Sequence, residues 1–181
     1  YVGVALLVLL IPLGALFYHF IGYVGLELTT GAQISVLIFA ILFTLLGGFI
    51  FASICGYFAG LVGGSNSPIS GMAMSALLLS SLMLLGLFVS LQIPLTTTAE
   101  KMAAAAFIVF ITTAILSAAA ITNDTIQDLK AGQIVGATPW KQQVMLILGT
   151  LVSAVVVPPI LSLLFNAYGI GTVFPRPGMD P

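Results

Sequence analysis

Charged side chains are concentrated in one short stretch of this chain, residues 123–143. The sequence holds four Lys or Arg and five Asp or Glu, and this stretch contains Asp124, Asp128, Lys130 and Lys141. Two carboxylates four residues apart share one face of a helix and repel each other. Such a pair is tolerated when it is well solvated, bound to a cation or partly protonated. Asp124 and Asp128 are therefore candidate proton-carrying groups, with a solvated connection between apolar helices as the alternative.

The same stretch has local signals for helix ends. Asp124 followed by Gln127 is a capping-box pattern, and Gly132 is placed to end the last turn, so we expect a short helix of its own here. Thr138 and Pro139 suit a turn or the start of a second helix. Trp140 and Lys141 follow directly as candidate anchors at a membrane interface.

A second polar stretch lies at residues 63–72, in otherwise apolar sequence. Ser67 is a good N-cap and Pro68 a good first helical residue, so a helix is expected to begin here. A helix N-terminus beside unwound, glycine-rich backbone can hold an anionic or polar ligand group, as in membrane transporters. An ordinary capped turn is the alternative. The predicted substrate-binding residues are Ser65, Asn66, Ser67, Pro68, Ser70 and Gly71.

The composition restricts the class of protein. The chain is 60% hydrophobic and 5% charged, and residues 28–99 contain no Asp, Glu, Lys or Arg. With a mean hydropathy of +1.25, these values predict an all-α, polytopic membrane protein embedded in a lipid bilayer. A net charge of −1 argues against a nucleic-acid partner. Cys55 is the single cysteine, so a disulfide framework and a cysteine-rich metal site are excluded, and we expect no metal and no cofactor.

About five membrane-spanning helices are expected from the apolar runs. The second run is too long for one upright crossing, so it either tilts or breaks near Gly47 and Gly48. Pro158 and Pro159 predict a kink or an opening in the last span. His19, the only histidine, suits an interface residue better than a proton relay. The expected spans cover residues 2–24, 33–64, 72–93, 102–122 and 144–166.

Small residues spaced by four form a ridge on the second predicted span. Such a ridge lets another helix approach closely in lipid, so Gly56 and Gly60 are expected to be packing residues. The ridge consists of Gly48, Ala52, Gly56, Gly60 and Gly64. Two crossings separate the two polar stretches, which places them on the same side of the membrane.

Taken together, the two polar stretches resemble the oligopeptide transporter superfamily, and most closely its prokaryotic branch, akin to the plant yellow stripe-like transporters. The resemblance runs from about Gly63 to the C-terminal tail. The plant branch has Asp-Phe-Lys-Thr-Gly-Tyr at residues 128–133, and the Asn-Pro-Gly and Lys-Ile-Pro-Pro-Arg signatures of the peptide-transporting branch are absent. The resemblance to the superfamily rests on three motifs of this chain: Gly63-Gly64-Ser65-Asn66-Ser67-Pro68-Ile69-Ser70-Gly71-Met72, Asn123-Asp124-Thr125-Ile126-Gln127-Asp128-Leu129-Lys130-Ala131-Gly132 and Gly136-Ala137-Thr138-Pro139-Trp140-Lys141-Gln142-Gln143.

The resemblance implies a proton-driven secondary transporter of small peptides or peptide-like metal chelates in the plasma membrane. It also implies that residues 1–181 are a central-to-late part of a longer chain, whose remaining spans are partners of these, in keeping with a start at Tyr1 rather than Met. A channel is the main alternative, with residues 65–71 as a re-entrant filter. An intramembrane hydrolase would need Ser70 and His19 as a pair, and nothing in the sequence orients that imidazole.

Overall fold

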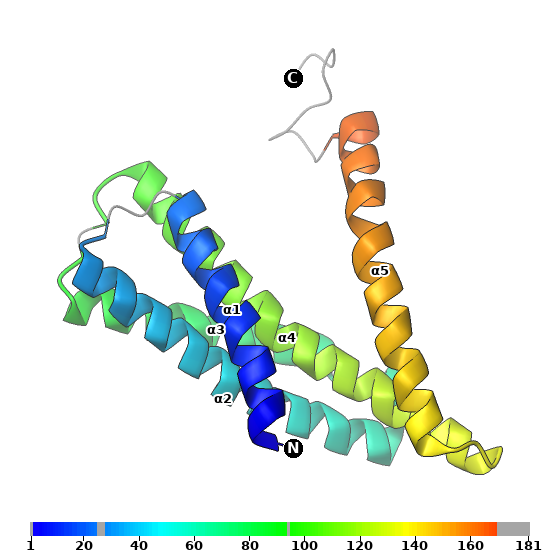
Figure 1. The fold of residues 1–181 in the computed structure, drawn as a ribbon. Coiled ribbons are helices and arrows are strands. Elements are labelled where there is room, and N and C mark those ends of the chain that lie inside the picture. Colours follow the sequence, from blue (N-terminus) through cyan, green and yellow to red (C-terminus); the bar gives the residue numbers. More distant parts are fainter. Residues whose placement is uncertain (1, 25–27, 94, 170–181) are drawn as a thin grey trace. The chain divides into compact units, whose positions relative to one another are not determined.

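The computed structural model describes residues 2–24, 28–93 and 95–169, and the side chains of residues 8–23, 28–93 and 95–169. It forms two compact units, Tyr1–Gln127 and Asp128–Pro181, so the boundary falls inside one helix. Figure 1 shows the helices in chain order. They are α1 (Val2–Val24), α2 (Thr30–Val62), the short 3-10 helix η1 (Gly64–Asn66), α3 (Ile69–Ser90), α4 (Thr98–Ile134) and α5 (Pro139–Tyr168).

Four of these helices, α2 to α5, are long and apolar enough to cross a membrane. This confirms the all-α, polytopic membrane architecture expected from the composition. The part of α1 with described side chains, Val8–Tyr23, is also apolar but shorter, so a crossing by α1 stays a prediction.

Glycines allow α2 and α4 to pack closely. A Cβ on Gly47 would lie 2.9 Å from Cδ1 of Ile115, and a Cβ on Gly56 would lie 2.8 Å from Cδ1 of Ile126. The residue numbers of both partners increase from the first contact to the second, so α2 and α4 run in the same chain direction. A small residue at each crossing point is what lets two apolar helices touch by backbone as well as side chain.

The ridge prediction is therefore only partly confirmed. Gly56 is buried against α4, whereas a Cβ on Gly60 would meet nothing within 4 Å among the described residues, so the packing role of Gly60 stays a prediction. Of the two alternatives for this long run, a tilt or a break near Gly47 and Gly48, the break is excluded, because α2 is one helix of 33 residues. Both glycines are buried on the face that α4 covers, and this packing supports the helix at the point where its propensity is weakest.

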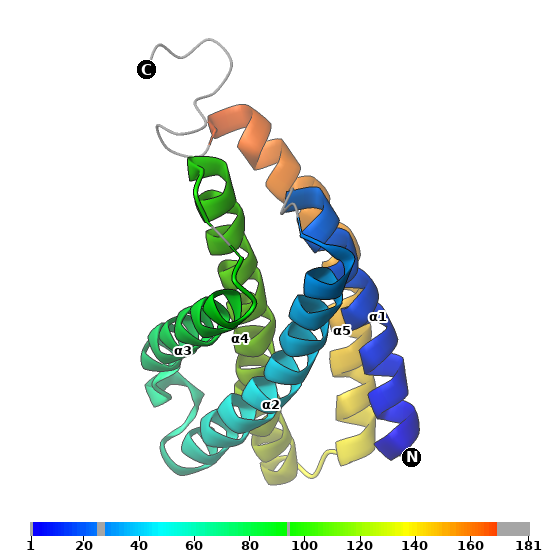
Figure 2. The same ribbon diagram turned by 90° about the vertical axis from the view of Figure 1, so that its left-hand side faces the viewer.

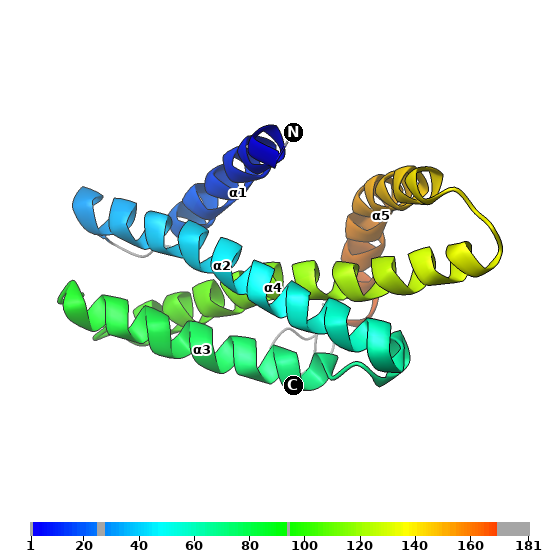
Figure 3. The same cartoon turned by 90° about the horizontal axis from the view of Figure 1, so that it is seen from below.

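The remaining helices of the first unit complete its core. Phe20 of α1 stacks on Phe110 of α4 with ring centroids 4.1 Å apart, and Phe17 meets the same ring edge-on at 5.5 Å. In α3 the buried side chains recur every four residues, at Met72, Ala76, Ser80, Leu84 and Phe88. Figures 2 and 3 show α2 entering and α3 leaving the turn of residues 63–68, so the two helices run in opposite chain directions.

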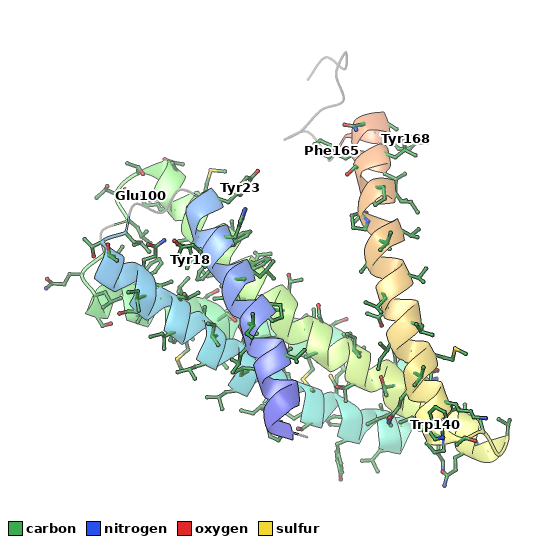
Figure 4. All side chains as sticks on the ribbon, viewed as in Figure 1. Tyr18, Tyr23, Glu100, Trp140, Phe165 and Tyr168 are labelled. Carbon is green, nitrogen blue, oxygen red and sulfur yellow. The ribbon has the colours of Figure 1, made fainter. Side chains whose placement is uncertain are left out.

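Helix α4 begins with a reciprocal cap. The backbone nitrogen of Glu100 donates to Oγ1 of Thr97 (3.2 Å), and Oε2 of Glu100 accepts from the backbone nitrogens of Thr97 (2.9 Å) and Thr96 (2.7 Å). This capping box satisfies amide groups that have no partner inside the helix. Glu100 lies at this first turn in Figure 4.

The capping box predicted at Asp124 is wrong. Helix α4 runs without interruption from Thr98 to Ile134, so Asp124 lies in its interior and the expected separate short helix does not exist. The backbone amides near Asp124 already bond to carbonyls of the preceding turns of α4, so no free amide remains for a cap.

Gly132 does not end α4 either; Gly136 does. The Ala137 nitrogen bonds to the Gly132 oxygen (2.8 Å), the Gly136 nitrogen bonds to the Gln133 oxygen (3.3 Å), and Gly136 has a φ of +74°. These bonds form a Schellman motif, in which a left-handed glycine follows the last helical turn. Thr138 then occupies the N-cap position of α5, without a side-chain capping bond, and Pro139 is the first residue of the helix. Of the turn or helix start predicted here, the helix start is confirmed.

Of the kink or opening predicted at the two prolines of α5, the opening is excluded, and a kink stays a prediction. The helix continues through Pro158 and Pro159 to Tyr168 as one element of 30 residues. None of its described side chains is fully buried, and most of its large apolar side chains are exposed.

Candidate functional site

The turn of residues 63–68 joins α2 to α3 and is compact. Gly63 ends α2 with a φ of +83°, a left-handed conformation that glycine adopts without strain. The nitrogens of Asn66 and Ser67 then bond to the oxygens of Gly63 and Gly64, both at 3.3 Å. This bonding holds the turn in one shape at the end of two membrane helices.

The start of α3 differs by one residue from the prediction. The N-cap of α3 is Pro68, not Ser67, and no side-chain hydrogen bond caps the start of the helix. The Ser67 hydroxyl is instead buried beside the Cys55 thiol, without a partner at ordinary hydrogen-bond geometry in the described part of the chain. Ser67 thus faces the protein interior.

The other predicted substrate-binding residues lie on the outside of this turn. The described residues leave Ser65, Asn66, Pro68, Ser70 and Gly71 exposed. The Asn66 amide makes a long bond to the Val62 oxygen (3.4 Å), which leaves its carbonyl oxygen available to a ligand.

Two side chains of α4 reach the turn from the polar stretch at 123–143. Asn123 is buried, and its Nδ2 lies 3.5 Å from the backbone oxygen of Gly64. A Cβ on Gly64 would lie 3.1 Å from the same nitrogen and would overlap the carboxamide of Gln127. We call Gly64, Ser67, Asn123 and Gln127 the polar cluster. It joins the two polar stretches, as expected from their placement on one side of the membrane.

The polar cluster contains an unsatisfied acceptor. Oδ1 of Asn123 is buried with no hydrogen-bond partner among the described residues, and Asn123 is 2% exposed. A buried polar atom in this state costs about 1–3 kcal/mol. Such atoms in native proteins are commonly explained by a ligand, a water or a further part of the protein.

The two predicted proton-coupling residues both lie on α4 and are exposed, but they belong to different units. Asp124 is in the first unit, and its Oδ1 lies 3.5 Å from Nδ2 of Asn123. Asp128 begins the second unit, where Lys130 donates to Oε1 of Gln133 (2.9 Å). Within the described ranges, no three His, Cys, Asp or Glu residues lie close enough to hold a metal ion.

The second unit has its own close contact where α4 turns into α5. The Gln142 carboxamide occupies the space that a Cβ on Gly132 would need. Trp140 lies exposed at the start of α5 with the Lys141 ammonium 5.9 Å from its ring, and Tyr168 lies exposed at the other end (Figure 4). Aromatic residues at both ends of an apolar helix are typical of the two membrane–water interfaces.

Asn123 and Gln127 were not predicted as site residues, although a signal for Asn123 is present. Every fourth residue of α4 before it is apolar, and those residues are buried on the face toward the other helices. The series is Phe107, Ile111, Ile115 and Ala119. Asn123 continues this series, so its burial could have been predicted. The sequence predicts Gln127 only as part of a helix cap, and its contact with Gly64 has no signal in the sequence.

Comparison with known proteins agrees with this architecture. Residues 1–179 match the family described as OPT oligopeptide transporter protein. The chain belongs to this OPT family. It is 43% identical over 134 residues to a Haemophilus influenzae protein described as "Putative oligopeptide transporter", an alignment that covers 74% of this chain and 21% of that protein. The chain thus spans about a fifth of its relative's length, and no solved structure matches it.

Proposed function

We propose that this chain is part of a secondary transporter that moves small peptides or peptide-like metal chelates across the plasma membrane, coupled to protons. Membership of the OPT family supports transport of peptides. Proton coupling and metal-chelate substrates are our extension, based on the two carboxylates of α4 and on the resemblance to the yellow stripe-like branch.

The observation that carries the proposal is the polar cluster. Burying an asparagine between helices this apolar is costly unless its polar groups find a partner or a ligand, because a buried polar atom without a hydrogen bond is destabilising. Here the buried Asn123 lies against an exposed turn with free hydrogen-bonding groups at Ser65 and Asn66. A peptide presents amides and carboxylates, which are groups that such a turn can bind.

The experiment uses the full-length protein in proteoliposomes, with labelled trialanine as the probe. Uptake that saturates and responds to an inward proton gradient supports a transporter, whereas rapid uptake without saturation indicates a channel. Asn66→Leu removes the polar side chain of the turn and should abolish uptake. Gln33→Leu, a similar change at the other end of α2, is the control and should leave uptake near the parent level.

The result against the proposal is equally definite. If Asn66→Leu inserts normally and transports trialanine at the parent rate, the turn does not bind the substrate. If the parent moves neither trialanine nor an iron-chelating peptide analogue, the substrate class is wrong.

A further inference from the structure

The carboxamide of Asn123 lies between two acceptors of different kinds. Its Nδ2 is 3.5 Å from the backbone oxygen of Gly64 and 3.5 Å from Oδ1 of Asp124. An amide nitrogen carries two hydrogens, so it can donate to both at once. Asn123 therefore connects a backbone group of the turn to a side chain that changes its charge.

The connection depends on the protonation state of Asp124. A hydrogen bond to an ionised carboxylate is stronger than one to a neutral acceptor. When Asp124 is ionised, it fixes the Asn123 carboxamide, which in turn fixes Gly64. Both contacts of the carboxamide are long, at 3.5 Å. When Asp124 is protonated, the contact with its Oδ1 weakens, and the carboxamide keeps only the equally long contact with the Gly64 oxygen.

Few other titratable side chains lie on the helices around Asn123. Helices α2 and α3 and the turn between them carry no Asp, Glu, Lys, Arg or His, and their only titratable side chains are Cys55 and Tyr57. Cys55 is buried beside Ser67, and Tyr57 is 67% exposed. On α4 itself the next carboxylate is Asp128, one turn further along. Asp124 is thus the charged group in contact with Asn123 in the first unit as described.

We infer that Asn123 is a positioning residue that transmits the protonation state of Asp124 to the turn of residues 63–68. The inference rests on the proposed function, since it takes that turn as the substrate-binding element. An ionised Asp124 keeps the turn docked on α4, and a protonated Asp124 lets it move away. Proton binding and substrate binding are then linked through one carboxamide.

The first test needs no substrate. Ser65→Cys is introduced into the full-length protein, and its labelling rate with N-ethylmaleimide is measured from about pH 3 to pH 7, a range that includes the ordinary titration of an aspartate. A second protein with Ser90→Cys, exposed at the other end of α3 and far in the sequence from any Asp or Glu, gives the reference rate. The ratio of the two rates cancels the pH dependence of the thiol reaction itself.

In the parent the ratio should rise roughly fivefold toward acid pH, which corresponds to the difference between a charge-assisted and a neutral hydrogen bond. Asp124→Asn should remove this pH dependence, and it changes only an exposed side chain, so it should fold. Asn123→Leu should also remove it, with fast labelling at every pH. Asp128→Asn is the matched control and should keep the dependence. A flat ratio in the parent, or a parent-like dependence in Asp124→Asn, overturns the inference.

A transport measurement separates this inference from the proposed function. Asn123→Leu should raise the KM for labelled trialanine more than it lowers kcat, because the turn is present but poorly held. If the parent does not transport trialanine and the labelling ratio still depends on Asp124, the substrate proposal fails while the positioning role stands. If the parent transports trialanine normally and the labelling ratio does not depend on pH, the positioning role fails while the substrate proposal stands.

Discussion

The Cα atom of Gly56 faces Ile126 so closely that a Cβ there would lie 2.8 Å from Cδ1 of that side chain and 3.0 Å from Cγ2 of Thr122. Gly60, one helical turn further along α2, has no such neighbour. The two glycines look equivalent in the sequence, yet only the first lies where α2 and α4 cross.

This contrast gives a matched pair of variants. Gly56→Leu should destabilise the full-length protein by about 1–3 kcal/mol, because a large side chain forces the two helices apart. Gly60→Leu should be close to neutral, since its side chain enters open space in this part of the chain. Thermal unfolding in detergent, followed by the loss of monodisperse protein, measures both. An equal loss of stability in the two variants would show that Gly60 is covered by another part of the full-length protein.

A second prediction concerns the contact between Gly64 and Gln127. Gly64→Ala should undock the turn from α4, because the new methyl group would overlap the Gln127 carboxamide. We expect a loss of about 1–3 kcal/mol in unfolding free energy. In a Gln127→Ala background the same change should cost clearly less, since the obstructing side chain is gone. Additive losses in the double variant would mean that the two residues do not interact.

The composition and the long apolar runs of the sequence were sufficient to predict a helical membrane protein. Helix ends were harder to predict, because similar patterns occur in different contexts. Asp124 and Gln127 match a capping box as well as Thr97 and Glu100 do, but only Thr97 lies where a helix actually begins. The pattern at Asp124 forms no cap because an apolar helix already runs into residue 123. Extending an existing helix by one residue is easier than starting a new one, so α4 continues through Asp124.

The candidate site shows the same limit. The two polar stretches could be assigned to one side of the membrane by counting crossings, and the contact of Gly64 with Asn123 agrees with that count. The direction in which Ser67 points could not be predicted. From the sequence alone its hydroxyl could equally well cap α3. Only the position of the hydroxyl beside Cys55 shows that Ser67 faces inward.

A third prediction concerns the Schellman motif at the end of α4. Gly136 has a φ of +74°, so Gly136→Val should cost about 1–2 kcal/mol in the stability of the α4–α5 connection. Gly136→Asn should cost less, because asparagine tolerates this conformation. Hydrogen exchange of the backbone amides around residues 132–142 measures the local opening. Equal exchange in the two variants would show that backbone strain at Gly136 is not what closes this turn.

The last prediction concerns Asp128 and asks whether the charged part of α4 takes part in proton coupling. Asp128→Asn keeps the size and hydrogen-bonding capacity of the side chain and deletes its charge. If Asp128 carries the coupled proton, the variant should accumulate labelled trialanine roughly tenfold less under a proton gradient, within the usual range of coupling energies. Exchange of trialanine without a gradient should be retained.

The measurement is uptake into proteoliposomes as a function of external pH. Lys130→Gln is the control, because it removes a neighbouring charge that pairs with Gln133 and not with a carboxylate. A variant Asp128→Asn with the pH profile of the parent would assign Asp128 to a solvated surface. Since the labelling ratio at Ser65 reports on Asp124 alone, a changed transport profile with an unchanged ratio would place the two carboxylates in separate steps of the transport cycle.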